Sequence, residues 1–309
     1  MKKLNLLLAL LLGFTILSCS SDDDTNDNEN LEKQLVQIKY QDLSNNQNQY
    51  VSNITYDTNG NIVEMNNENG QITNSYSYNS LNHLVHQEYF EYVNSTSNDL
   101  DFKEITTFSY DNNNKILTAQ ETYINYVPGG NPNESTVTHS ITYSNNLMTK
   151  TSDDFANTKV EYGLDDNNLI TSIKVYRNNI LKSNMAFTYD NNGNCISGIG
   201  PIDEGSLDST TDNINLIASY GSRQKASIIN TFFDYNILTW GTSFTNFKEL
   251  LTKQQGNNYP IEIEWYQYSD YTYKETYNNS FDSLGYIESI MLSEIPDYPN
   301  YGTITYKWE

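Results

Sequence analysis

The sequence predicts an all-β protein, in which a large antiparallel meander of hairpins curls into an open or closed soluble barrel-like sheet. Three observations support this fold class. A turn phrase, first seen as "YDTNGNI" from Tyr56, recurs along the chain. The segments between the turns alternate apolar and polar residues, or carry β-branched and aromatic residues, as strands do. Helical patterning is confined to residues 211–256.

Residues 1–18 are predicted to be a lipoprotein signal peptide. Lys2 and Lys3 form a positive n-region, and residues 4–17 form an apolar h-region that is too short for a stable membrane span. The segment runs into "ILSC", in which a small residue precedes Cys19. This arrangement resembles the bacterial lipobox, in which the cysteine is lipidated and becomes the first mature residue. An ordinary signal peptide that contains a cysteine is the alternative.

Residues 19–33 are predicted to form an acidic disordered tether. The run "SSDDDTNDNEN" (20–30) has no apolar residue, so it cannot bury surface to offset the entropy lost on ordering. A serine followed by aspartates after the cysteine also resembles the surface-export signal of Bacteroidota lipoproteins, and a plain solvated linker is the alternative. Together the two segments predict an outer-membrane lipoprotein that is exposed on the cell surface and has no transmembrane span in its mature form.

The charge of the chain argues against nucleic acid as a partner. The formal net charge is −22. Removal of residues 1–18 takes away two lysines and no acid, which leaves 15 basic and 39 acidic side chains and a charge of −24. No basic stripe exists that could neutralise phosphates. No cofactor and no catalytic residue are predicted, because the sequence contains no phosphate loop, zinc signature or nucleophile elbow.

Residues 34–309 are predicted to form a single β-meander domain, whose hairpins are closed by the turn phrase. The aspartate of the phrase bonds the backbone ahead of it in a type I turn. The residue four positions after the aromatic adopts a left-handed conformation, which closes a three-residue loop with a bulge. The aromatic then lies opposite the aliphatic residue six positions later. The predicted turn residues are Asp57, Gly60, Asn82, Asp111, Asn114, Asp190, Gly193 and Gly285.

The remaining elements follow from periodicity. The clearest predicted strands lie at residues 34–40, 135–143, 171–176, 261–268 and 301–309. The segment 246–256 is predicted to be a helix, because three apolar residues share one helical face between an N-cap pair and a glycine stop. The segment 211–221, "TDNINLIASYG", is predicted to be a second short helix. These one or two helices near 211–256 are expected to cover one end of the sheet.

Tyrosines are the main candidates for ligand binding, because the chain contains 26 of them. The densest cluster consists of Tyr266, Tyr268, Tyr271 and Tyr273. On a curved sheet such side chains can bind sugars by stacking. The alternative is structural, since inward-facing tyrosines also fill a wide sheet.

No metal site is predicted. His83 and His86 are three residues apart on a strand, so they point to opposite faces. His139 stands alone, and is interpreted as structural or solvated. The turn that begins at Asp57 fails the calcium-loop pattern, because its sixth residue is not glycine. Cys195 is interpreted as a small apolar residue in a strand.

The phrase "YDxxGNI", together with the lipobox and the acidic tether, resembles two groups of proteins. It is similar to the tyrosine–aspartate repeats of RHS-type proteins, which form long β-sheets that wrap into shells. The arrangement over residues 34–309 resembles a Bacteroidota lipoprotein domain family of unknown function with a porin-like β fold. Residues 258–290 carry that likeness best, and depart from it at "SLGYI" (283–287), where the family more often has an acidic residue before Gly and Pro after Tyr. The family has no established activity, so the resemblance implies no catalytic residue.

The sequence therefore predicts a surface-anchored, non-enzymatic lipoprotein β module that binds or presents a glycan or protein partner. Two alternatives remain open: a structural or assembly lipoprotein of an outer-membrane complex without a small ligand, and a hydrolase that uses an unidentified carboxylate pair. A concave face with exposed aromatics favours the first reading, and a buried polar cleft with two carboxylates favours the hydrolase. A spanning pore is not implied, because Lys39, Asn53 and Thr55 are expected to face water.

We expect Cys19→Ala to release the protein from membranes, because the variant has no thiol to accept the lipid. Cell fractionation, together with metabolic labelling by an alkyne fatty acid, measures this directly. Cys195→Ala is the matched control, and should keep both the lipid label and the membrane location. Retention of the Cys19 variant in the membrane fraction contradicts the anchor.

Overall fold

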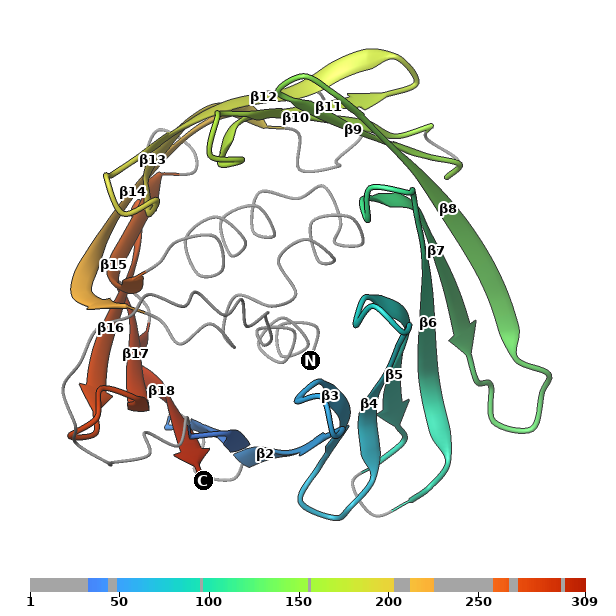
Figure 1. The fold of residues 1–309 in the computed structure, drawn as a ribbon. Coiled ribbons are helices and arrows are strands. Elements are labelled where there is room, and N and C mark those ends of the chain that lie inside the picture. The colour runs from blue at the N-terminus through green and yellow to red at the C-terminus, as the bar shows by residue number, and fades with distance from the viewer. Residues whose placement is uncertain are drawn as a thin grey trace, which may run out of the picture.

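In the computed structural model, the described residues are 33–43, 49–94, 97–154, 157–202, 212–224, 258–266, 272–295 and 298–309. They form one antiparallel sheet of 18 strands that closes into a barrel (Figure 1). The first nine strands are β1 (Leu35–Asp42), β2 (Gln49–Tyr56), β3 (Ile62–Asn66), β4 (Ile72–Tyr78), β5 (Leu84–Tyr92), β6 (Leu100–Tyr110), β7 (Ile116–Asn125), β8 (Asn133–Ser144) and β9 (Leu147–Ser152). The other nine are β10 (Lys159–Leu164), β11 (Ile170–Arg177), β12 (Ile180–Tyr189), β13 (Cys195–Ile202), β14 (Asp212–Gln224), β15 (Asn258–Tyr266), β16 (Thr272–Phe281), β17 (Ile287–Ile295) and β18 (Tyr298–Trp308).

Each of these strands pairs with its neighbours in sequence, and the ends of the chain close the barrel. β1 pairs with β2 on one edge and with β18 on the other, where Tyr40 lies opposite Ile304. Two further backbone hydrogen bonds, Gln34 N to Glu309 O at 2.6 Å and Glu309 N to Gln34 O at 2.8 Å, extend this ladder past the strands. Closure leaves these strands without the unpaired edges at which sheets associate.

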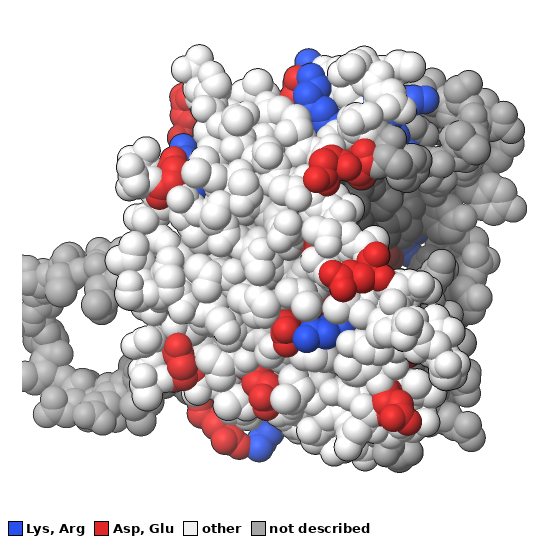
Figure 2. Space-filling model, turned by 90° about the vertical axis from the view of Figure 1, so that its right-hand side faces the viewer, with Lys and Arg blue, Asp and Glu red and all other residues white. Residues whose placement is uncertain are grey.

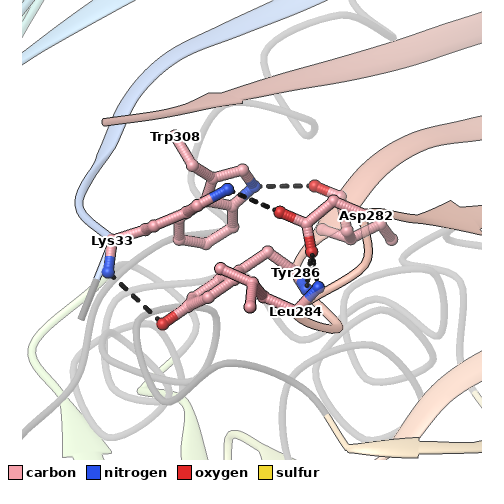
Figure 3. A network of polar contacts seen from close by, with 6 residues as sticks. Lys33, Asp282, Leu284, Tyr286 and Trp308 are labelled. Atoms are coloured by element: carbon pink, nitrogen blue, oxygen red, sulfur yellow. Dashed lines mark hydrogen bonds and ion pairs between the residues drawn. The ribbon is translucent and has the colours of Figure 1, made fainter. Parts of the chain in front are cut away.

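A polar network fastens the start of β1 to the turn between β16 and β17 (Figure 3). Lys33 Nζ donates to Asp282 Oδ2 at 2.7 Å, and the Lys33 backbone N–H donates to the Tyr286 hydroxyl at 3.3 Å. The Tyr286 ring packs on Trp308, with ring centroids 5.0 Å apart, and the Trp308 indole donates to Ile287 O at 2.7 Å. The hydrogen bond from Lys33 lowers the pKa of the Asp282 carboxyl, assisted by two N–H groups of its own turn.

The turn phrase forms the same hydrogen bonds each time. In the first copy, Asp57 Oδ1 accepts the N–H groups of Asn59 and Asn61 at 2.8 Å, and Gly60 N donates to Asp57 O at 3.1 Å. A bulge follows, so that Tyr56 pairs with Ile62. The left-handed residues of the predicted turns are Gly60 (φ 82°), Asn82 (φ 60°), Asn114 (φ 63°), Gly193 (φ 75°) and Gly285 (φ 93°).

The tyrosines of the phrase also bond the adjacent strand. The Tyr56 hydroxyl donates to Leu35 O at 2.6 Å, across the sheet from its own turn. The hydroxyls of Tyr110 and Tyr189 make the equivalent bonds to Leu84 O and Ile170 O. Each of these hydrogen bonds connects the end of one strand to the start of the preceding strand, and so helps to set the register between the two strands.

Side chains alternate between a buried inner face and an accessible outer face. On β12, Ser183, Met185 and Phe187 are buried while the residues between them are exposed. The outer face carries hydroxyl pairs between strands: Ser109 with Thr118 (2.6 Å), Thr188 with Ser197 (2.6 Å) and Ser280 with Ser289 (2.7 Å). Figure 2 shows that the side of the barrel built by β6, β7 and β8 is mostly uncharged, with acidic side chains and fewer basic ones scattered over it.

The predicted helix at 211–221 is wrong, because these residues belong to β14 from Asp212 onward. β14 pairs with β13 and β15, and Leu216 and Ala218 are buried while Ile217 between them is exposed. The spacing of apolar residues therefore has a period of two, which the short segment did not distinguish from a helical period. The helix expected at 246–256 lies outside the described residues. Within the described ranges, no helix is long and apolar enough to cross a membrane.

We expect Gly60→Ala to lower the free energy of unfolding by about 1–2 kcal/mol, because an L-residue is strained at this positive φ. A Cβ at Gly60 would meet no atom within 4 Å, so any loss of stability comes from backbone strain and not from a steric clash. Asn114→Gly, at the equivalent position of another turn, is the matched control and should leave stability nearly unchanged. Urea denaturation of the two variants checks this, and equal stabilities would contradict the left-handed requirement.

Candidate functional site

A cluster of polar side chains lies on the inner face of β6 to β9, in a barrel whose other buried inner positions are mostly apolar. We call it the inner-face cluster. Its members are Glu104, Thr106, Glu121, His139, Lys150 and Ser152. All except Glu104 are no more than 9% exposed. Buried polar groups are costly without partners, so their arrangement needs a physical account.

Strand register alone brings these residues together. Inward positions recur at every second residue of a strand. Thr106 on β6 lies opposite Glu121 on β7, and His139 on β8 lies opposite Ser152 on β9. Ala119, which lies opposite His139 on β7, has a small side chain that leaves room beside the imidazole.

Three members form a hydrogen-bonded chain across β7, β8 and β9. His139 Nδ1 is 2.7 Å from Ser152 Oγ, and His139 Nε2 is 3.0 Å from Glu121 Oε2. The Tyr123 hydroxyl also donates to Glu121 Oε2, at 2.5 Å. An ionised carboxylate only accepts hydrogen bonds, so Nε2 of a neutral imidazole carries the proton and Nδ1 accepts from the serine hydroxyl.

The second oxygen of Glu121 has no such support. Glu121 Oε1 is buried and has no hydrogen-bond partner within the described part of the chain. A buried acceptor without a donor costs the desolvation of that group, about 1–3 kcal/mol. This oxygen is therefore a buried acceptor without a donor among the described residues.

Burial and neighbouring charge set the protonation of two further members. Burial, with the charge of Glu121, raises the pKa of Glu104 to about 7. Burial lowers the pKa of Lys150 to about 8, against the opposing effect of Glu121 and Asp154. Near neutral pH, Glu104 therefore exchanges its proton readily, and perturbed groups of this kind gather at functional sites.

Three aromatic rings border the cluster on the same inner face. We call them the aromatic row: Tyr89 on β5, Phe102 on β6 and Tyr123 on β7. The Tyr89 and Phe102 centroids are 6.3 Å apart, and so are the Phe102 and Tyr123 centroids. All three rings are partly exposed, and Glu104 lies between Tyr89 and Tyr123 in register. The row thus presents ring surface directly beside a carboxylate.

The Ser152–His139–Glu121 chain has the order of nucleophile, base and orienting acid used in acyl transfer. Such catalysis also needs N–H donors for the oxyanion. The N–H groups nearest to the serine are occupied, because Ser152 N donates to Thr158 O at 2.8 Å and Asp153 N donates to Thr138 O at 3.1 Å. These two N–H groups are therefore not free to form an oxyanion hole beside Ser152.

The predicted tyrosine cluster is only partly within the described chain. Tyr266 in β15 lies opposite Thr272 in β16, and Tyr273 lies opposite Trp265. The side chains of Tyr266 and Tyr273, and the whole of Tyr268 and Tyr271, lie outside the described residues, as does Cys19.

The remaining histidines and the second cysteine have separate environments. His83 stacks on Tyr110, with centroids 5.0 Å apart, whereas His86 Nε2 is 3.2 Å from Glu88 Oε1. Cys195 is a free, buried thiol, and burial raises its pKa to about 12. In the ranges that the structure describes, no three His, Cys, Asp or Glu side chains are grouped to hold a metal ion.

The sequence did contain a signal for the inner-face cluster, although sequence reasoning missed it. Asn145 and Asn146 form a two-residue turn, with Asn145 at φ 50°, which pairs Ser144 with Leu147. Counting outward from such a turn places position 139 opposite position 152. His139 thus had a predictable partner on the next strand.

Comparisons with known proteins identify no family. No protein-family model matches the sequence, and no curated protein matches it. Among solved structures, a porin-like protein from Bacteroides vulgatus has a TM-score of 0.46 and 10% identity, over 89% of this chain and 98% of that one. A porin-like protein from Bacteroides uniformis has a TM-score of 0.35 and 15% identity, over 72% of this chain and 95% of that one. At these values no functional conclusion follows, and the resemblance to RHS-type repeats stays a prediction.

We expect Glu104→Gln to stabilise the protein at high pH only. The folded state holds a proton on Glu104 up to about pH 7, whereas the unfolded state releases it near the ordinary value of 4.5, so stability falls as pH rises between these values. Glutamine has no proton to lose. The free energy of unfolding at pH 8 should rise by roughly 2–3 kcal/mol, with little change at pH 4.5.

Urea denaturation at the two pH values measures this effect. Glu134→Gln is the matched control, because Glu134 is exposed on β8, two strands away from Glu104, and the variant should show no such dependence. A Glu104 variant whose stability shifts equally at both pH values would count against the raised pKa.

Proposed function

We propose that this chain is a lipid-anchored, non-enzymatic β-barrel module of the bacterial outer membrane that binds a glycan on the inner face of β5 to β8. One observation carries the glycan part: the aromatic row lies beside the buried carboxylate of Glu121, whose second oxygen has no donor among the described residues. The lipid anchor rests on Cys19 and the segment around it.

The site has the two surfaces that a sugar needs. Sugars present apolar C–H faces, which pack on aromatic rings, and hydroxyl groups, which bond to fixed acceptors and donors. Phe102 and Tyr123 provide the rings, and Glu104, Glu121 and Thr106 provide the polar groups. All lie on the same face of β6 and β7 in register, and Phe102 and Tyr123 lie near the loop at 126–132 that joins β7 to β8.

The outer wall supports a barrel that stands in water and is held to the membrane by its lipid. Lys39, Asn53 and Thr55 lie on the outer face of β1 and β2, where Lys39 pairs with Val51 and Gln37 pairs with Asn53. Hydroxyl pairs continue this polar surface on other strands. A lipid-facing barrel would need an apolar outer band instead.

Glycoside hydrolysis is the second candidate, because Glu104 and Glu121 form a carboxylate pair on this face. A carboxyl with a pKa of about 7 is suited to act as a general acid at neutral pH. Hydrolysis predicts that a bound oligosaccharide is shortened over time, whereas a binding module releases it unchanged. Chromatography of the oligosaccharide after incubation separates the two functions.

We expect Phe102→Ala to weaken glycan binding by about five- to ten-fold, since an aromatic contact contributes about 1 kcal/mol beyond buried area. A glycan array selects the ligand, and titration calorimetry measures the affinity. Phe90→Ala is the matched control, because Phe90 is on the outer face of β5. The Lys103 Nζ atom lies 5.1 Å from the centroid of the Phe90 ring.

The opposite outcomes point to the other readings. Equal losses in the Phe102 and Phe90 variants place the ligand elsewhere. An array without any binding, together with one stoichiometric protein recovered by pull-down through the lipid anchor, supports the assembly lipoprotein instead.

A further inference from the structure

The inner face beside the aromatic row carries an excess of negative charge. Glu91, Glu104 and Glu121 lie on the inner faces of β5, β6 and β7, one on each successive strand. Lys103, the nearest lysine in β6, points to the outer face and pairs there with Glu88 at 2.9 Å. The lysine of the inner-face cluster is Lys150 on β9, and the charge of Glu121 acts on it.

Glu121 is already held on one side and open on the other. Its Oε2 accepts from Tyr123 and His139, so the carboxylate cannot turn without breaking two bonds. Its buried Oε1 therefore keeps a fixed position with no donor in the described chain. A group that brings several N–H donors and a positive charge would satisfy this oxygen and offset the repulsion between Glu121 and Glu104.

The aromatic row adds a second preference for a cation. Elsewhere in the described chain, lysine ammonium groups lie over aromatic rings, at 4.7 Å from Tyr143 and 4.0 Å from Tyr176. Within the same described residues, no lysine lies over the rings of the aromatic row. Ring faces beside carboxylates attract ammonium groups through the ring quadrupole as well as through charge.

We propose that the glycan bound on this face is an amino sugar with a free amine. Its ammonium lies between Glu104 and Glu121, and its ring packs on Phe102 and Tyr123. This inference rests on the proposed glycan binding and narrows it to a cationic sugar. A neutral or N-acetylated sugar would leave the repulsion between the two carboxylates in place.

The same groups give the site a pH dependence. Tyr89 on β5 and Tyr123 on β7 lie opposite Glu104 in register, the charge of Glu121 acts on it, and Glu91 acts with it on Tyr89. Below pH 7, Glu104 gains a proton and loses the charge that attracts the ammonium. Affinity for a cation is therefore expected to fall as the pH falls.

The test uses the full chain and three short β-1,4-linked oligomers that differ only at carbon 2: glucosamine, N-acetylglucosamine and glucose. Titration calorimetry at neutral pH should give an affinity about ten-fold higher for the glucosamine oligomer than for the other two. Glu104→Gln should abolish this difference while the protein stays folded, as checked by circular dichroism. Glu134→Gln is the matched control and should keep the difference.

Methylammonium, which has three N–H donors and stays charged between pH 6 and pH 8, serves as the probe for the ammonium alone. It should bind more weakly at pH 6 than at pH 8, and this difference between the two pH values should be smaller in Glu104→Gln. Equal affinity for all three oligomers overturns the ammonium inference and leaves glycan binding standing. Binding of methylammonium without binding of any oligomer supports the ammonium site and overturns glycan binding. Absence of binding by every probe overturns both.

Discussion

Pairing between the first and last strands is the interaction on which the rest of this structure depends. The β1–β18 ladder turns a meander with two free edges into a closed wall with an inner and an outer face. Closure gives the two faces of each strand different environments: alternate side chains are enclosed inside the barrel, and the others are exposed to water. The Lys33–Asp282 ion pair and the Tyr286–Trp308 contact reinforce the wall at this seam.

A closed ladder also explains how a polar cluster is held on an inner face. Each strand is bonded on both edges, so the positions of Glu121, His139 and Ser152 are set by backbone pairing rather than by loops. A site built on paired strands is rigid, so the Glu121 oxygen that has no partner in the described part of the chain cannot easily move to find one. That rigidity supports the proposal that Glu121 Oε1 is a preformed contact for a ligand.

The predictability of the fold differed from that of the site. Asp57 and Gly60 are local signals, because a turn depends on a few adjacent residues, and the structure has φ of 82° at Gly60. The segment from Asp212 was misassigned because its period could not be resolved over so few residues. His139 looked isolated because its partners, Glu121 and Ser152, are brought to it by pairing across strands.

The sequence by itself determined that the chain is a hairpin meander, since aspartate, asparagine and glycine at set spacings leave the backbone few other conformations. It also determined which residues share a face, because that follows from a period of two. Only the tertiary structure decided that the sheet closes, and that Glu104 and Glu121 meet beside the aromatic row. Closure and cross-strand contact depend on the register of every hairpin at once, and no single stretch of sequence contains that sum.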